Sequence, residues 1–207
     1  MTFLTFRRHY LDKMLAGTSF SGAIIDIGGK KVRRRGKFVP PLERVSVWHV
    51  VNLDPGAEPD FCCDAAQIPV PDSSYDMALL CEVLEHLPSP EAVLTEACRV
   101  LNQNGTLVLS APFLYAVHAD PADYQRWTAD KLSQSLATAG FESADISTMG
   151  GFGAVIYDMA MALWSNTRWR HLFRFLRPVF ALMERLNVGN PAKVTTGYFV
   201  LAPKRSE

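Results

Sequence analysis

Short apolar runs that end at turn residues alternate with stretches of helical periodicity in this chain, and this alternation limits the fold more than any other feature. Residues 23–27, 47–53 and 75–81 are such runs, and residues 90–101 place apolar side chains on one helical stripe. Parallel strands need long crossover connections, which helices usually supply. The pattern therefore predicts an α/β chain with a doubly wound, mostly parallel sheet.

Turn and capping residues bound the other expected elements. Ser89 and Pro90 suit the start of the helix at 90–101. The remaining elements are a turn at 102–105, a strand at 106–113, a helix between Thr128 and Gly140, short strands near 143–148 and 196–201, and a strand within 61–76. Together they predict one domain over residues 1–207.

Residues 150–195 separate the last two expected strands, and they are too many for a hairpin. They predict a helical insertion or lid, in which Pro178 should kink or divide the helix. Three interpretations are open: packing on the domain or on a second copy of the chain in a homodimer, closure over an acceptor, or peripheral contact of residues 164–187 with an anionic membrane.

Charge is distributed unevenly, although the formal net charge is zero. Residues 1–44 carry a net +7, residues 45–150 a net −12 and residues 151–207 a net +5. An acidic middle suits a cationic ligand and basic ends suit an anionic partner, whereas the neutral whole predicts no nucleic-acid binding. The four cysteines lack zinc-site spacing, so we expect no metal, and they are typical of a reduced, cytoplasmic protein.

Acidic residues follow successive expected strands, at the edge where ligands of such sheets bind. They are Asp26 with Gly28 and Gly29 after 23–27, Asp54 after 47–53, Asp64 after the strand within 61–76, and Glu82, Glu85 and His86 after 75–81. Each acid alone is equally consistent with a turn residue or a helix cap. However, a carboxylate such as Asp54 accepts two hydrogen bonds from a ribose diol, which favours a nucleoside-containing cofactor.

The glycine loop distinguishes two classes of nucleoside cofactor. A dinucleotide site needs a GxGxxG loop whose N–H groups meet a pyrophosphate. This chain has GGKKVR at residues 28–33, with no third glycine. S-adenosylmethionine carries no phosphate and is therefore favoured over NAD.

At these residues the sequence resembles the class I S-adenosylmethionine-dependent methyltransferases, over about residues 20–145 and most specifically over 62–113. The resemblance implies a Rossmann-like fold and S-adenosylmethionine as cofactor. It also implies the cofactor-binding residues, which are Asp26, Gly28 and Gly29 at the methionine end, Asp54 at the ribose, Asp64 and Ala65 beside the adenine, and Cys81 and Glu82 closing over the cofactor. The chain departs from the family at residues 30–35, where basic residues replace the usual continuation.

Polar side chains crowd residues 113–128, beside an expected strand end, and predict an acceptor site. We expect His118 and Asp120 to take a proton from a hydroxyl acceptor, and Asp123, Tyr124 and Arg126 to bind that acceptor. The alternative is a loop fastened by its own hydrogen bonds. Methyltransferases with a similar block are often associated with glycans, which favours O-methylation of a sugar, glycan-linked or other small-molecule acceptor.

Two other functions stay open. The altered loop at residues 30–35 favours a non-catalytic interaction scaffold that keeps the fold, and an NAD-dependent oxidoreductase is the third alternative. The five cations Lys30, Lys31, Arg33, Arg34 and Arg35 have two interpretations of their own. They contact an anionic acceptor or the inner face of a membrane, or they form a solvated loop.

Overall fold

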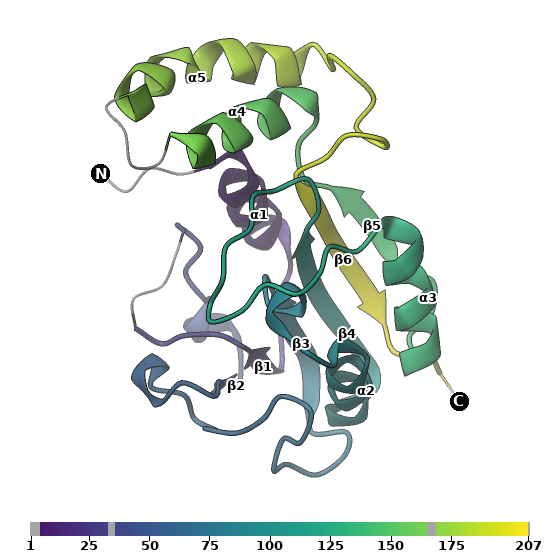
Figure 1. Ribbon diagram of the computed structural model, residues 1–207. Helices are drawn as coiled ribbons and strands as arrows, with labels where there is room; N and C mark the ends of the chain where they lie inside the picture. Colours follow the sequence, from purple (N-terminus) through teal and green to yellow (C-terminus); the bar gives the residue numbers. More distant parts are fainter. Residues whose placement is uncertain (1–4, 33–35, 165–168, 207) are drawn as a thin grey trace.

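The computed structural model describes residues 5–32, 36–164 and 169–206, in which helices pack on a six-stranded sheet (Figure 1). The helices and strands are α1 (Phe6–Gly17), β1 (Ala23–Ile27), β2 (Val47–Val51), β3 (Tyr75–Cys81), α2 (Pro90–Val100), β4 (Leu101–Pro112), α3 (Ala129–Ala139), β5 (Asp145–Thr148), α4 (Phe152–Leu163), α5 (Trp169–Arg185) and β6 (Gly197–Pro203). Three 3-10 turns are η1 (Leu42–Arg44), η2 (Pro55–Ala57) and η3 (Leu84–His86).

The sheet has the strand order β2-β1-β3-β4-β6-β5. Strands β2, β1, β3 and β4 are parallel, whereas β6 is antiparallel to both β4 and β5. The prediction of a mostly parallel, Rossmann-like sheet with a helical insertion before the last strand is therefore confirmed. Because the four parallel strands all end at the same edge, the loops that follow β1, β2, β3 and β4 converge there.

Two connections differ from the predicted alternation of strands and helices. Among the described residues, the connection from β1 to β2 contains only η1, and that from β2 to β3 contains only η2. The prediction of a strand within 61–76 was wrong, since the segment forms only one isolated bridge, between Val51 and Phe61. Pro69 and Pro71 contribute no N–H group to a ladder, which accounts for the absence of a strand over that part of the segment.

The turn predicted at 102–105 lies inside β4 as an irregularity. Tyr75 pairs with Leu101, and the next pair in register joins Met77 to Thr106, so the intervening residues of β4 bulge out of the ladder. The N–H group of Asn104 donates to Asn102 Oδ1 at 3.2 Å, which is the side-chain bond expected of a turn. The segment thus turns locally without ending the strand.

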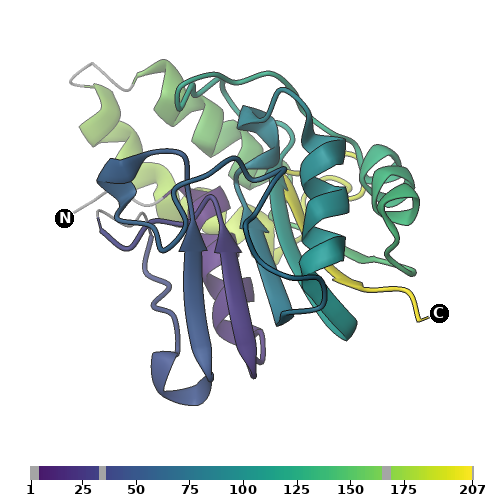
Figure 2. The same ribbon diagram turned by 90° about the horizontal axis from the view of Figure 1, so that it is seen from below.

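Helices cover both faces of the sheet (Figure 2). Alternating residues of β1 show the division, since Ile25 packs in the same core as α2 and α3, whereas Ile24 packs with Leu11 and Leu15 of α1. The bounds predicted for α3 are confirmed, because Thr128 caps its first turn and Gly140 follows its last residue with φ of +102°. Helix α1 was not anticipated from the sequence.

The insertion between β5 and β6 is a helical hairpin of α4 and α5 that lies against α1. Tyr157 packs edge-on against Phe6 and contacts Phe180, while Tyr10 donates a hydrogen bond to Glu184 at 2.9 Å. The interpretation that the insertion packs on its own domain is confirmed for this face. Helix α5 continues through Pro178, so the proline does not divide the helix, and the alternative prediction of a kink there stays a prediction.

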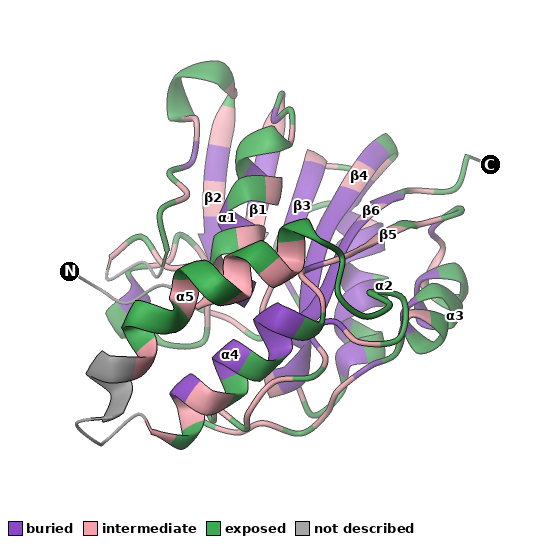
Figure 3. Ribbon diagram, turned by 90° about the horizontal axis from the view of Figure 1, so that it is seen from above, coloured by how far each residue is buried: buried purple, intermediate pink, exposed green. Residues whose placement is uncertain are grey.

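The opposite side of the hairpin is open to solvent, as the exposed outer face of α5 shows (Figure 3). No described helix is long and apolar enough to cross a membrane.

Candidate functional site

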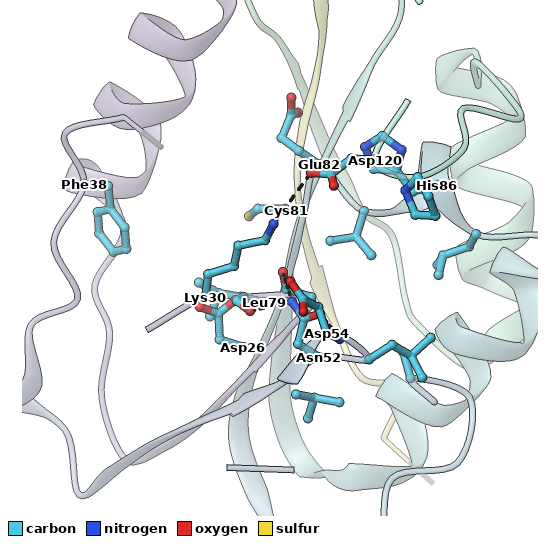
Figure 4. A pocket seen from close by; sticks show the side chains of 18 of the residues that line it. Asp26, Lys30, Phe38, Asn52, Asp54, Leu79, Cys81, Glu82, His86 and Asp120 are labelled. Atoms are coloured by element: carbon cyan, nitrogen blue, oxygen red, sulfur yellow. Dashed lines mark hydrogen bonds and ion pairs between the residues drawn. The ribbon is translucent and has the colours of Figure 1, made fainter. Parts of the chain in front are cut away.

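A cavity of about 380 Å³ opens at the edge of the sheet where the parallel strands end (Figure 4). All eight predicted cofactor residues line it, and so do the two predicted catalytic residues. They are Asp26, Gly28, Gly29, Asp54, Asp64, Ala65, Cys81, Glu82, His118 and Asp120. Asp123, Tyr124 and Arg126, which the sequence assigned to the acceptor, do not line it.

The first loop requires glycine at two successive positions. Gly28 has φ of +80°, and a Cβ atom there would lie 2.4 Å from Val83 Cγ2. A Cβ atom on Gly29 would lie 2.3 Å from Asp26 Oδ2. The Asp26 carboxylate therefore packs directly over the loop, at the floor of the cavity, and both glycines are needed for that approach.

Asn52 holds the glycine loop in place from the neighbouring strand end. Its Nδ2 donates to the carbonyl oxygens of Gly28 at 3.2 Å and Gly29 at 2.8 Å. Its Oδ1 accepts from the N–H group of Asp54 at 2.9 Å. Asn52 was not among the predicted site residues, and its position directly after β2 is the one feature of the sequence that points to it.

Asp54 and Asp64 act as turn residues and also line the cavity. Asp54 Oδ1 accepts from the N–H group of Gly56 at 2.9 Å, and Asp64 Oδ1 accepts from that of Ala66 at 2.9 Å. Both residues are exposed at the cavity rim. A role in the turn and a role in cofactor binding are therefore compatible for both acids, because each carboxylate has a second oxygen beyond the one that caps its turn.

Helix α1 contributes an arginine to the cavity wall. The Arg7 guanidinium forms an ion pair with Glu82, both side chains being 9% exposed, and lies 4.0 Å above the Tyr115 ring. Glu82 also accepts a hydrogen bond from Ser110 Oγ at 2.9 Å and has φ of +60°. Arg7 was missed because α1 itself was not predicted.

Cys81 lies at the end of β3 and faces the same cavity. Burial, with a smaller contribution from the nearby charge of Asp26, raises the pKa of its thiol to about 12. The thiol is therefore neutral at physiological pH and is a packing group here, since reactive cysteines have lowered pKa values.

The basic loop is divided between two environments. Lys31 Nζ lies 2.5 Å from Asp60 Oδ1, and its backbone N–H donates to Ala57, so Lys31 ties the loop to the segment after β2. Lys30 lines the cavity with its Nζ 3.6 Å from Asp120 Oδ2, the pair joined by a dashed line in Figure 4. Arg33, Arg34 and Arg35 lie outside the described residues.

Hydrogen bonds within the predicted acceptor loop fasten it. Arg126 forms an ion pair with Asp123, and this interaction holds the pKa of the Asp123 carboxyl well below its usual range. Asp123 also accepts from the N–H group of His118 at 2.8 Å, while Tyr124 is 60% exposed. The Asp123–Arg126 pair therefore shapes the loop that carries His118 and Asp120 into the cavity.

The fold and this cavity define an α/β protein with an open cavity at the ends of its parallel strands. A family model described as a methyltransferase domain matches residues 34–109. This part of the chain is therefore similar to an S-adenosylmethionine-dependent methyltransferase domain.

Two curated relatives, both named "Probable S-adenosylmethionine-dependent methyltransferase", match part of the chain. One from Mycolicibacterium smegmatis is 33% identical over 93 residues, which are 42% of this chain and 35% of that protein. One from Mycobacterium tuberculosis is 31% identical over 124 residues, which are 56% of this chain and 44% of that protein. The chain thus spans less than half the length of either relative.

Solved structures share the fold at low sequence identity. The cyclase SpnF aligns with a TM-score of 0.60 and 18% identity, over 95% of this chain and 80% of that one. A Thermotoga maritima structure described as an S-adenosylmethionine-dependent methyltransferase aligns with a TM-score of 0.59 and 16% identity, over 97% of this chain and 91% of that one. These likenesses establish the fold alone.

Proposed function

We propose that this protein transfers a methyl group from S-adenosylmethionine to an oxygen atom of a small acceptor. The observation that carries the proposal is the convergence of the predicted cofactor residues on one cavity. They come from segments after β1, β2 and β3 that are well separated along the chain. The names of the curated relatives support the same activity.

The residues that line the cavity suit this cofactor. The Asp54 carboxylate suits a ribose diol, and Ala65 and Leu87 offer apolar surface to a purine. Asp26 and Glu82 suit a ligand with positively charged sulfonium and amino groups. When bound, S-adenosylmethionine supplies an already activated methyl group.

The protein's own part is to position the acceptor and to receive its proton. Orientation of two reactants can contribute up to about 7–11 kcal/mol to the lowering of a barrier. His118 and Asp120 lie in the cavity wall, and an imidazole or a carboxylate can accept a proton from a hydroxyl group. Arg7 and Ser110 support the Glu82 side chain between them.

We infer an acceptor of the sugar or glycan-linked class. The support is the block His-x-x-Pro-x-Asp-Tyr-x-Arg at residues 118–126, whose Asp123 and Arg126 shape the loop and whose Tyr124 presents an exposed ring outside the cavity. This inference rests on analogy with proteins that carry a similar block. Measurement of methyl transfer to candidate sugars tests whether this loop binds the acceptor.

The alternative from another class is a non-catalytic scaffold. The altered loop at residues 30–35 favours it, and the fold is shared with a protein described as a cyclase. Calorimetric titration of the full chain with S-adenosylmethionine, S-adenosylhomocysteine and NAD separates the functions. Binding of the first two alone supports methyl transfer, binding of none supports the scaffold, and binding of NAD alone supports an oxidoreductase.

We also propose that the outer face of α5 contacts an anionic lipid surface. Phe175, Val179, Leu182 and Leu186 recur on this face and are each more than half exposed, with Arg174 exposed beside them. Phe173 and Phe180 of the same helix instead pack inward against the domain. Co-sedimentation with phosphatidylglycerol vesicles, and not with phosphatidylcholine vesicles, is expected, and Phe175→Ser should reduce it.

A further inference from the structure

The side chain of Glu85 is buried beside the cavity without a hydrogen-bond partner. Glu85 is 1% exposed, and neither of its carboxylate oxygens has a hydrogen-bond partner among the described residues. An ionised carboxylate taken out of water in this way is costly unless a cation or several donors compensate for the lost hydration. The mechanism proposed above gives this carboxylate no role.

Two histidines lie against Glu85 with the same ring nitrogen toward it. Nε2 of His118 is 3.4 Å from Glu85 Oε1, and Nε2 of His86 is 3.7 Å from the same atom. On the far side of each ring, Nδ1 meets a backbone carbonyl: Ala116 at 3.2 Å for His118, and Ala122 at 2.5 Å for His86. A carbonyl accepts only, so each Nδ1–H donates outward, and Nε2 is the ring atom of each histidine that is turned toward Glu85.

This arrangement has the form of a metal site. An imidazole that ligates through one nitrogen usually donates its other N–H to a carbonyl or a carboxylate, which fixes the ring. One ligand atom from each of Glu85, His86 and His118 lies within 4.8 Å of the others. Two imidazoles and a carboxylate suit divalent transition metals, with ligand distances of about 2.0–2.2 Å for zinc.

Ion pairing of Glu85 with neighbouring cationic groups explains the arrangement of Glu85, His86 and His118 less well than metal binding does. A charge-assisted hydrogen bond between an imidazolium and a carboxylate needs about 2.7–2.9 Å, and both Nε2 atoms lie beyond that distance. Arg126 also interacts electrostatically with Glu85, but its guanidinium is bonded to Asp123. The Glu85 carboxylate thus faces two imidazoles without a hydrogen bond to either of them.

We propose that Glu85, His86 and His118 bind a divalent transition-metal ion, of the class of zinc or manganese. Glu85 and His86 are held by η3 after β3, and His118 by the loop after β4, and these parallel strands are neighbours. His86 and His118 also line the cavity, so a further coordination position faces it. No metal was expected from the sequence, because its cysteines and histidines lack zinc-site spacing.

The role of this site in catalysis rests on the proposed function, although metal binding itself does not. A metal-bound hydroxyl group is more acidic than a free one, as metal-bound water is. The acceptor's O–H bond would break with its proton passing to Asp120, and the electron pair left on oxygen would form the bond to the methyl carbon. The bond from that carbon to sulfur would break at the same time, and its electron pair would stay on the sulfur of the departing S-adenosylhomocysteine. His118 then acts as a metal ligand and not as the proton acceptor.

Metal binding is tested on the full chain after treatment with a chelator and dialysis. Calorimetry with zinc, manganese or magnesium chloride should show one equivalent of zinc or manganese bound by the wild type. His118→Ala and Glu85→Gln should each weaken that binding at least about a hundredfold. His9→Ala, which removes an exposed imidazole on α1, should bind as the wild type does.

Absence of zinc or manganese binding by the wild type, or equal binding by folded His118→Ala, overturns the proposal. Circular dichroism shows whether the variants fold, and His86→Asn is the replacement if Glu85→Gln does not. The visible absorption of bound cobalt gives a second measurement, which should be lost in the same variants and kept in His9→Ala. A parallel titration with S-adenosylmethionine separates the proposals, because cofactor binding without metal binding rejects only this one.

Discussion

The carboxylate of Asp158 accepts a hydrogen bond from the backbone N–H group of Arg7, at 2.9 Å, and so joins the helical insertion to the cavity wall. Its second oxygen accepts from the N–H group of Phe6 at 2.8 Å, and both bonds are buried. Helix α4 thereby caps the first turn of α1, which carries the Arg7 side chain to Glu82. The insertion between β5 and β6 thus helps to position a residue of the candidate site.

Asp158 should make stability depend on pH in an unusual direction. Burial raises the pKa of its carboxyl to about 6, although the N–H groups of Arg7 and Phe6 and the charge of Arg7 act against burial. The folded chain therefore holds more protons than the unfolded chain between about pH 4 and 6, and this group's contribution falls as pH rises through that window. Across this window the contribution of Asp158 to the free energy of unfolding falls by about 2–3 kcal/mol, because each pKa unit corresponds to roughly 1.4 kcal/mol.

Urea unfolding of Asp158→Asn and of the wild type, measured from pH 4 to 7, checks this direction. Asparagine does not titrate, so the stability difference should move in favour of the variant as pH rises. A lost cap lowers the variant's stability at every pH and does not alter this slope. Parallel curves for the two proteins would show that Asp158 does not titrate in this window.

The ion pair between Arg7 and Glu82 should show strong coupling. Removal of one partner leaves a buried charge uncompensated, which typically costs about 3–5 kcal/mol. We expect Arg7→Met and Glu82→Gln each to destabilise the chain, and the double variant to be less destabilised than the sum of the two. A double-mutant cycle by urea unfolding measures the coupling, and strictly additive effects would contradict it.

Asp54→Asn should weaken binding of S-adenosylmethionine about ten- to a hundredfold, because a charged acceptor contributes about 1.5–3 kcal/mol. Asparagine keeps the oxygen that accepts from the N–H group of Gly56, so the turn at η2 should persist. Asp145→Asn on β5, which is exposed and outside the cavity, is the matched control. Calorimetry that gives the same dissociation constant for Asp54→Asn and wild type would remove Asp54 from the ribose role.

Asn52→Ala should lower both stability and cofactor affinity, since it removes the two bonds that hold the carbonyl groups of Gly28 and Gly29. Loss of such bonds costs about 1–3 kcal/mol where the partners are left unsatisfied. Asn104→Ala, at an exposed position in the bulge of β4, provides the comparison. If thermal unfolding and calorimetry show equal behaviour of the two variants, Asn52 does not hold the loop.

The local sequence pattern was sufficient to predict the strands of the parallel sheet and the helices that have clear caps. In three elements, apolar residues recur clearly at strand or helix spacing and a capping or turn residue marks an end. These elements are Ala23–Ile27, Pro90–Val100 and Ala129–Ala139, and each lies within one residue of its predicted bounds. Helix α1 could not be predicted in this way, since its apolar residues do not recur clearly on one helical face. It is held by burial of Leu11 and Leu15 against the sheet and by Asp158 at its first turn.

Candidate cofactor residues could be predicted because most of them lie at or just after the end of a strand, and parallel strands end at one edge. The sequence by itself thus determined the class of the sheet, the similarity to methyltransferases and many of the residues that line the cavity. Only the tertiary structure decided that Arg7 meets Glu82, that Asn52 holds the glycine loop, and that Glu85, His86 and His118 lie together. These contacts join segments far apart in the chain, and their geometry depends on packing that no local period encodes.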